Sequence, residues 1–363
     1  MKVLLLVNEF RTWYIGRHLS YSAQLGIEEG LCANGADCQV LTTPWLPRIL
    51  DSFRGRRFDQ VWIAGRLDIL AEQSLTRLAE LAPIRLGLLS ESTRYTAEEC
   101  AISPGLKHRK HLIEKRLPYL THIAACDETD ADSINSQGAM PAIWWPQAVP
   151  ERFITEGAAQ PRRSTAIFCG NPYALRREYL RHPELGRVLV HVRSSEWTTV
   201  DPLIFTALHL PLLWPIRSAF ETDHKVLDSY LSRLRSLRRR CFQRWLETLQ
   251  SGRAVVNLPH FVKTYAGRVV ESMAAGRPVI SWEIPDRPRN KALFEDGSEV
   301  LLFAKNDPTQ LVDQIKRVLS DQNLSRKLVV NAQRKLRRFH TLEVRVRQIL
   351  DWLNCGRSPQ YTN

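Results

Sequence analysis

The segment FVKTYAGRVVESMAAGRPVI, residues 261–280, carries a basic and an acidic residue one helical turn apart. Arg268 offers a rigid fork of hydrogen-bond donors that matches the oxygens of a phosphate. Glu271, three residues later, falls on the same face of a helix. Its carboxylate can accept hydrogen bonds from the two vicinal hydroxyls of a ribose. A phosphate clamp followed by a ribose acceptor is what a site for a nucleoside diphosphate requires. The alternative is an exposed ion pair on a solvated helix, which contributes only about 0.2–0.5 kcal/mol.

The elements around this pair predict where it lies. The apolar run AVVNLP, residues 254–259, is typical of a buried strand. A helix over 266–275 is expected to end at Gly276, because glycine adopts the left-handed cap conformation without steric cost. The start of this helix therefore follows the carboxyl end of a strand, where unpaired amides and the helix dipole favour an anion such as a diphosphate. Further donor-binding residues are expected in the preceding loop and at the helix start: Lys263, Thr264, Tyr265 and Gly267.

Apolar runs alternate with helical patterns along the chain, which predicts an α/β fold with parallel sheets covered on both faces. In the first part of the chain the predicted strands cover residues 2–7, 38–43, 60–65, 84–89, 121–126 and 141–145. In the second part they cover residues 165–170, 187–192, 254–259, 277–282 and 299–304. Three helices, over residues 307–320, 322–338 and 340–353, are expected to close the chain.

This alternation is interrupted once, by a polar segment rich in Gly, Pro and Ala, which is typical of a linker. We therefore predict two Rossmann-like domains, with an N-terminal domain over 1–150, a linker over 151–164, a C-terminal domain over 165–340, and a terminal helix and tail over 341–363. Ligands of such sheets bind beyond the carboxyl ends of the strands. A cleft that the two domains face is the expected site.

The composition indicates an anionic partner. The chain has 51 lysines and arginines against 38 aspartates and glutamates, a formal net charge of +13. A nucleic acid, a phosphorylated ligand or a membrane surface would each suit this excess. The seven cysteines include no CxxC pair, which argues against a disulfide framework and a zinc site. No segment has the length of a signal peptide or a membrane span. We therefore expect a cytoplasmic protein, with any membrane contact peripheral.

Two segments carry a resemblance to a known family. With GRVVESMAAGRPVIS (267–281) and EDGSEVLLFAKNDPTQLVDQIKRVL (295–319), the chain resembles the C-terminal nucleotide-sugar domain of the group 1 glycosyltransferases, which have the GT-B architecture. WWPQAVPERF (144–153) is similar to the stretch that leaves their N-terminal domain. IFCGNPYALRREYL (167–180) is similar to the opening strand and loop of their second domain. The resemblance covers most of the chain and is most specific in the first two segments.

This resemblance implies a hexosyltransferase-type enzyme with a nucleoside-diphosphate sugar, such as a UDP-sugar, as donor and with no obligatory metal or other cofactor. The N-terminal domain would then face the acceptor, and the C-terminal domain would bind the nucleotide sugar. Glu271 would hold the donor ribose, and Gly170 and Asn171 would line the donor site. The sugar, the base and the acceptor stay open, the acceptor being a glycan, a lipid, a protein, a small molecule or a nucleic acid.

One departure from the family bears on the reaction. Group 1 enzymes usually carry a second glutamate eight residues before the ribose-binding one, where this chain has Lys263. Retention of the anomeric configuration is therefore no longer implied, and an inverting reaction needs a base for the proton of the acceptor. Glu91, in SESTRYT after the predicted strand 84–89, is the candidate general base. An ordinary loop carboxylate is the alternative interpretation. Weaker candidates for the base are His18, His111 and His260.

Other features have plain structural interpretations. DETDAD, residues 127–132, contains an Asp-x-Asp pattern that binds metal in a different glycosyltransferase fold, but here it opens a helix and is expected to cap it. Gly16, after the first strand, either lets a helix approach the donor closely or forms a plain turn.

Two basic runs leave the partner open. Residues 230–246 hold six arginines and no acid, and their apolar side chains, Trp245 among them, recur at helical spacing. This run and residues 107–116 are interpreted as solvated faces, with an anionic acceptor, a lipid surface or a nucleic acid as alternatives. Two further functions remain alternatives to sugar transfer: a sugar-nucleotide epimerase of the same fold and a non-catalytic nucleic-acid-binding protein.

Overall fold

The computed structural model describes the chain except for residues 9–24, 43–45, 157–159, 194–222 and 363. The chain forms two compact units that exchange segments. The first consists of Met1–Trp145, Thr198–Cys241 and Ile349–Ser358, and the second of Pro146–Trp197, Phe242–Gln348 and Pro359–Asn363. The chain enters the second unit at Pro146, close to the predicted boundary.

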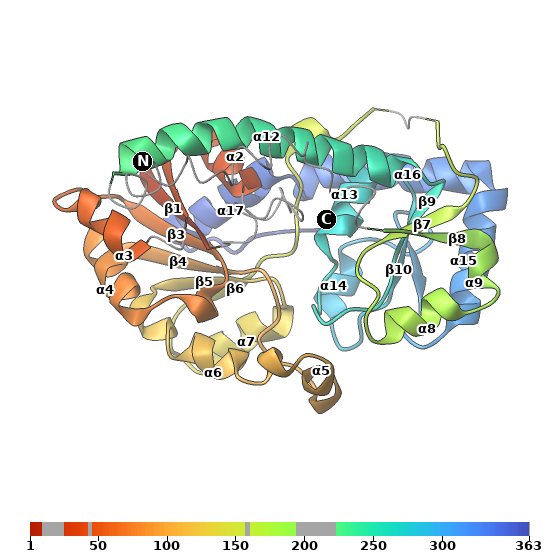
Figure 1. The fold of residues 1–363 in the computed structure, drawn as a ribbon, viewed down its shortest axis with the longest axis horizontal. Coiled ribbons are helices and arrows are strands. Elements are labelled where there is room, and N and C mark those ends of the chain that lie inside the picture. The colour runs from red at the N-terminus through yellow and green to blue at the C-terminus, as the bar shows by residue number, and fades with distance from the viewer. Residues whose placement is uncertain (9–24, 43–45, 157–159, 194–222, 363) are drawn as a thin grey trace, which may run out of the picture. The chain divides into compact units, whose positions relative to one another are not determined.

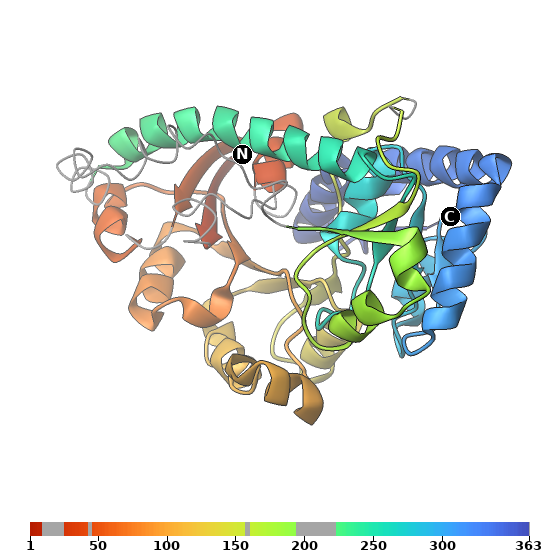
Figure 2. The same ribbon diagram turned by 45° about the vertical axis from the view of Figure 1, so that its right-hand side comes forward.

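Each unit contains one parallel sheet with helices packed against it (Figures 1 and 2). The strands of the first unit are β1 (Lys2–Asn8), β2 (Asp37–Thr42), β3 (Gln60–Gly65), β4 (Ile84–Leu89), β5 (His122–Ala125) and β6 (Ala142–Trp144), in the order β2-β1-β3-β4-β5-β6. The strands of the second unit are β7 (Ala166–Cys169), β8 (Leu189–Val192), β9 (Ala254–Asn257), β10 (Val279–Trp282) and β11 (Leu301–Phe303), in the order β11-β10-β9-β7-β8. The prediction of two Rossmann-like parallel-sheet domains is confirmed.

The predicted strand segments match the observed ones because each is a short apolar run that both faces of a covered parallel sheet bury. Every residue of β3, β7, β9 and β10 is buried. In the second sheet Ala166 of β7 pairs with Ala254 of β9 and with Leu189 of β8. Chain order reverses between β7 and β9, so the second sheet has its topological switch point there, where such sheets bind ligands.

The helices also follow the predicted pattern. In the first half of the chain they are α2 (Leu25–Ala33), α3 (Leu46–Ile49), α4 (Glu72–Leu81), α5 (Ala97–Ile102), α6 (Arg109–Glu114), α7 (Glu128–Ser136), α8 (Leu175–Arg181) and α9 (Leu185–Val188). After them come α12 (His224–Gln250), α13 (Gly267–Ala274), α14 (Pro288–Ala292), α15 (Pro308–Ser320), α16 (Gln322–Phe339) and α17 (Leu342–Cys355).

Two helix ends confirm local predictions. The side chain of Asp127 accepts a hydrogen bond from the Thr129 amide at 3.1 Å and caps α7, as expected for DETDAD. Gly276, just after α13, has φ +71°, the left-handed conformation that favours glycine. In contrast, the segment predicted as a linker is partly packed, because the Thr155 amide donates to the carbonyl of Ala274 at 3.0 Å.

Within the described residues, no helix combines the length and the hydropathy that crossing a membrane requires.

Candidate functional site

The start of α13 lies where the sequence places it, after the carboxyl end of β9 and beside the switch point of the second sheet. Ala266 precedes the helix in an extended conformation and carries no side-chain cap. The first amides of α13 are therefore not capped by their own N-cap side chain, and the positive end of the helix dipole lies at the same place.

Arg268 is the central cation of this region. Its Nη1 makes a long hydrogen bond of 3.5 Å to Asn257 Oδ1, and its guanidinium carbon lies 5.3 Å from the centre of the Phe168 ring. Its Nε is buried and has no hydrogen-bond partner in the described part of the chain. Burial lowers the pKa of Arg268, because the charged form loses hydration. A buried, positively charged N–H group without a hydrogen-bond acceptor is unusual in a folded protein, unless a ligand supplies that acceptor.

Gly170, which follows β7, makes room for this guanidinium. A Cβ atom at this position would lie 2.8 Å from Arg268 Nη2 and 2.9 Å from the Phe168 ring. Any side chain here would therefore displace the arginine. The predicted donor-site role of Gly170 remains a prediction, but its close approach to Arg268 gives that role a physical basis. Asn171, the next residue, is exposed.

Arg176 of α8 is a second cation that the sequence analysis did not single out. Its Nε donates to the carbonyl of Pro259 at 2.8 Å, and its guanidinium carbon lies 4.5 Å from the ring centre of Tyr173. Burial, with the nearby charge of Arg268, lowers the pKa of Arg176 to about 10. Within the described residues no carboxylate forms an ion pair with either arginine. Arg176 lies in IFCGNPYALRREYL, which resembles the opening strand and loop of the family's second domain, and this was the available signal.

His260 adds a neutral donor beside the two arginines. The amide of Val262 donates to its Nδ1 at 3.1 Å, so the ring proton resides on Nε2. That Nε2 is buried without a hydrogen-bond partner among the described residues. Burial, together with the charges of Arg176 and Arg268, holds the pKa of His260 well below its usual range. The sequence analysis considered this histidine only as a weak candidate base, whereas its neutral form here is a hydrogen-bond donor.

Glu271 lies one turn into α13 and is only 4% exposed. The indole Nε1 of Trp245, on α12, donates to Glu271 Oε2 at 2.8 Å. The negative charge of Glu271 raises the pKa of Arg268, although the opposite effect of burial is larger. The predicted alternative, an exposed ion pair on a solvated helix, is therefore excluded.

The other residues predicted in the loop differ in what their side chains contact. The Thr264 hydroxyl donates to Asn290 Oδ1 at 3.1 Å and is fully buried. The ring of Tyr265 packs against Phe294 with centroids 5.7 Å apart, so this side chain belongs to the core. Lys263 and Gly267 are partly exposed at the start of the helix. Gly16 and His18 lie outside the described residues.

Glu91 belongs to the first unit, after β4. It forms an ion pair with Arg109 of α6, whose side chain is 5% exposed whereas that of Glu91 is 43% exposed. Burial lowers the pKa of Arg109, but the charges of Glu91 and Tyr95 outweigh this, so the pKa is raised overall. The interpretation of residues 107–116 as a solvated face is wrong at Arg109, because the helix turns this residue inward against Glu91.

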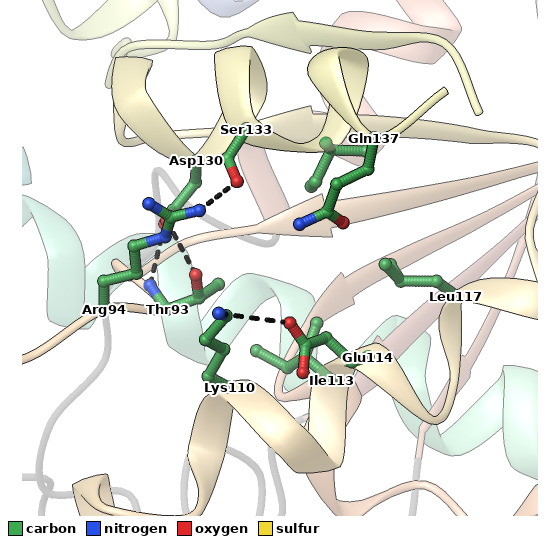
Figure 3. Close-up of a pocket in the computed structure, with 10 residues that line it drawn as sticks. Thr93, Arg94, Lys110, Ile113, Glu114, Leu117, Asp130, Ser133 and Gln137 are labelled. Atoms are coloured by element: carbon green, nitrogen blue, oxygen red, sulfur yellow. Dashed lines mark hydrogen bonds and ion pairs between the residues drawn. The ribbon is translucent and has the colours of Figure 1, made fainter. Parts of the chain in front are cut away.

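A small pocket in the first unit lies between α6 and α7 (Figure 3). Asp130 accepts hydrogen bonds from the Thr93 amide at 2.7 Å and from its hydroxyl at 2.6 Å. Lys110 pairs with Glu114 at 3.4 Å across the pocket's lower rim. The cavity volume is about 20 Å³, close to the least that one water molecule needs. This pocket is too small for a sugar, and most of its polar side chains pair with one another: Thr93 with Asp130, Arg94 with Ser133 and Lys110 with Glu114.

Stability is expected to fall as the pH drops below about 6.5, because the imidazole of His340 and Nε2 of His260 are buried and the folded chain keeps both rings neutral. Burial lowers the pKa of His340 well below its usual value, and the nearby Arg345 adds to this effect. The unfolded chain therefore binds protons that the folded chain excludes. Each histidine should reduce the free energy of unfolding by at most about 1.4 kcal/mol per pH unit, between pH 6.5 and its lowered pKa in the folded chain.

Urea unfolding at pH 7.5, 6.5 and 5.5 tests this expectation. His340→Gln should flatten the pH dependence relative to the wild type, whatever it does to the stability at pH 7.5. Since the carboxylates are the same in both proteins, an unchanged slope would mean that His340 titrates normally in the folded state.

The comparisons with known proteins agree with this fold. Residues 221–351 match the family described as "Glycosyl transferase-like". Among solved structures, HepE of Anabaena in complex with UDP and glucose is similar with a TM-score of 0.60 at 11% identity, over 98% of this chain and 100% of that chain. Sucrose-phosphate synthase of Thermosynechococcus elongatus gives a TM-score of 0.58 at 12% identity, over 98% of each chain. The chain has the GT-B fold of these proteins.

A glycosyltransferase of Rickettsia africae ESF-5 is also similar, with a TM-score of 0.55 at 10% identity over 96% of this chain and 97% of that chain. Because these structures are only 10–12% identical to this chain, their similarity establishes the fold alone. The family match identifies residues 221–351 as glycosyltransferase-like. The resemblance predicted from GRVVESMAAGRPVIS is thereby confirmed for the fold, and the match over residues 221–351 supports a transferase-type enzyme. No curated protein gives a significant match to the sequence.

Proposed function

We propose that this GT-B chain transfers a sugar from a nucleoside-diphosphate sugar to an acceptor, without an obligatory metal. The nucleotide of the donor is uridine, guanosine or thymidine diphosphate in this proposal. The diphosphate is held at the start of α13 by Arg268, with Arg176 and His260 beside it, and the ribose is held by Glu271. Lys263 lies close enough in sequence to add a charge toward the diphosphate.

One observation carries this proposal. Arg268 Nε and His260 Nε2 are buried hydrogen-bond donors without partners in the described part of the chain. Both lie at the switch point of a parallel sheet, beside the start of a helix. An unpaired buried donor costs about 1–3 kcal/mol, so its presence at such a site favours an anionic ligand as the missing partner. A diphosphate has the charge and the acceptor oxygens to fill this role.

The comparisons support the donor class. Two of the similar structures of HepE contain UDP and UDP-glucose. The alternative of a nucleic-acid-binding protein is not favoured, because two unpaired buried donors, Arg268 Nε and His260 Nε2, lie together beside the start of α13. The epimerase alternative is not favoured by the glycosyltransferase-like family match.

Thermal unfolding with added nucleotides tests the proposal. UDP, GDP and dTDP, each at millimolar concentration, are added singly, and a ligand that binds only the folded state raises the midpoint. At least one of them should raise it, while the corresponding nucleoside without phosphate should not. The donor-site proposal fails if none of the three diphosphates stabilises the protein.

Glu271→Ala should separate the ribose from the phosphates. The variant should bind the selected nucleoside diphosphate more weakly than the wild type, because the ribose hydroxyls lose their acceptor, with an expected loss of about 1.5–3 kcal/mol. Its affinity for inorganic pyrophosphate should stay unchanged. Calorimetric titration measures both ligands, and an equal loss for both would contradict the ribose assignment.

A further inference from the structure

Trp245 makes a direct contact with the proposed ribose acceptor. It lies in the last turns of α12, in the part of that helix that belongs to the second unit. Its indole Nε1 donates to Glu271 Oε2 at 2.8 Å, an ordinary length for such a bond. Trp245 itself is only partly buried, whereas Glu271 is 4% exposed.

Other contacts fix α12 against α13 without Trp245. Gln250 Nε2 donates to the carbonyl of Ala275 at 3.2 Å, and Arg277 Nε donates to the carbonyl of Gln250 at 3.0 Å. Leu246 and Leu249 of α12 are buried. The relative placement of the two helices therefore depends on the end of α12 and on apolar packing. The indole hydrogen bond acts instead on one atom, Oε2 of the glutamate.

The chemistry of the two side chains explains what this bond does. A glutamate has three rotatable bonds, and a buried carboxylate is costly unless it is hydrogen-bonded. An indole is rigid and carries a single N–H that can donate but not accept. A carboxylate has about four lone-pair sites, so a bond from the indole leaves capacity for hydroxyl groups. Trp245 can therefore fix the orientation of the Glu271 carboxylate and still leave it able to accept from a ribose.

We propose that Trp245 is a positioning residue for recognition of the donor ribose, acting through Glu271. This inference rests on the proposed function, in which Glu271 accepts hydrogen bonds from the ribose. It adds a requirement that the sequence analysis did not contain, since Trp245 was predicted there only as part of an apolar helix face. Trp245 selects nucleotides that carry both ribose hydroxyls, because only those use the orientation it imposes.

The test compares nucleotides with and without the ribose hydroxyls. UDP and GDP are titrated calorimetrically, each beside its 2′,3′-dideoxy counterpart. The wild type should bind the ribonucleotide more tightly than the dideoxynucleotide. Trp245→Phe keeps the aromatic packing and removes the N–H. It should weaken binding of the ribonucleotide about tenfold and leave binding of the dideoxynucleotide unchanged.

Two further variants separate positioning from general structure. Gln250→Met removes a contact between the same two helices but none to the carboxylate, and it should keep the wild-type preference for ribose. Trp245→His restores a ring N–H and should recover part of the preference if the donor is what matters. Unfolding midpoints of all variants identify any that lose structure.

Three results would contradict the positioning role of Trp245. Equal weakening of ribonucleotide and dideoxynucleotide in Trp245→Phe overturns the positioning role, as does an unchanged preference for ribose. Loss of the preference for ribose in Gln250→Met would also overturn the positioning role, because the packing of the two helices would then explain the preference. If the wild type binds neither UDP nor GDP, or does not distinguish them from the dideoxy forms, this inference is wrong, whereas the donor-site proposal fails only if dTDP does not bind either.

Discussion

Arg268→Ala is expected to raise the dissociation constant of the donor nucleotide about tenfold to a hundredfold. The loss follows from a hydrogen bond to a charged group, which contributes about 1.5–3 kcal/mol. The effect should be the same for the nucleoside diphosphate and for inorganic pyrophosphate, because Arg268 is assigned to the phosphates. Calorimetric titration with both ligands measures it.

The same substitution should leave the unligated protein at least as stable as the wild type. Arg268 has a buried Nε without a hydrogen-bond partner and forms no ion pair with a carboxylate in the described residues. Removing such a charge takes away a desolvation cost that we expect to exceed its long hydrogen bond to Asn257 and its contact with the Phe168 ring. A residue kept for binding and not for folding should show this combination of weaker binding and unchanged or higher midpoint.

Arg177→Ala is the matched control. Arg177 is the neighbour of Arg176 on α8, is exposed, and donates from Nε to the carbonyl of Pro172 at 2.9 Å. The Arg177→Ala variant should bind the nucleoside diphosphate and pyrophosphate with the wild-type affinity. Wild-type affinity in Arg268→Ala, or an equal loss in Arg177→Ala, would contradict the assignment of Arg268.

Glu91→Gln is expected to lower the rate of transfer by at least about a hundredfold with donor affinity nearly unchanged. A sugar hydroxyl is a poor nucleophile until a carboxylate takes its proton in the transition state, and such catalysis contributes about 10²–10⁴ in rate. The amide of glutamine has nearly the same shape but cannot take the proton. Transfer to the acceptor identified from a panel of glycans, lipids and small molecules measures the effect.

The ion pair with Arg109 affects this prediction in two ways. It fixes the orientation of the Glu91 carboxylate, while 43% of the side chain remains exposed to an incoming acceptor. It also means that a proton taken up by Glu91 leaves the buried charge of Arg109 uncompensated, which is costly. Glutamine can still accept a hydrogen bond from Arg109, so the surrounding structure should persist in the variant.

The anomeric configuration of the product provides the second readout. With Lys263 in place of the acidic residue usual in retaining relatives, a direct displacement assisted by Glu91 should invert the donor's configuration. Nuclear magnetic resonance of the product distinguishes the two outcomes. Transfer at the wild-type rate in Glu91→Gln, or a product that keeps the donor configuration, would identify Glu91 as an ordinary partner of Arg109.

The sequence predicted the sheets well because short apolar runs bounded by polar turns determine strands that are buried on both faces. It also predicted the start of α13, since Gly276 and the preceding strand constrain that helix at both ends. The return of Ile349–Ser358 to the first unit was not predicted. Local patterns carry no information on which unit a terminal helix packs against.

The residues of the candidate site were predicted only where they are adjacent in sequence. Arg268 and Glu271 share one helix turn, so their spacing reveals them. Arg176 contacts the carbonyl of Pro259, 83 residues away, and Trp245 reaches Glu271 from another helix. Such contacts arise from tertiary packing, and neither helical periodicity nor residue type predicts them.

A crystal structure with the nucleoside diphosphate that most raises the unfolding midpoint tests the central claim most directly. The account predicts the diphosphate at the start of α13, with its oxygens within hydrogen-bond distance of Arg268 and His260, and the ribose hydroxyls on the carboxylate of Glu271. A nucleotide bound elsewhere on the chain, or bound with its base rather than its diphosphate against Arg268, would contradict it.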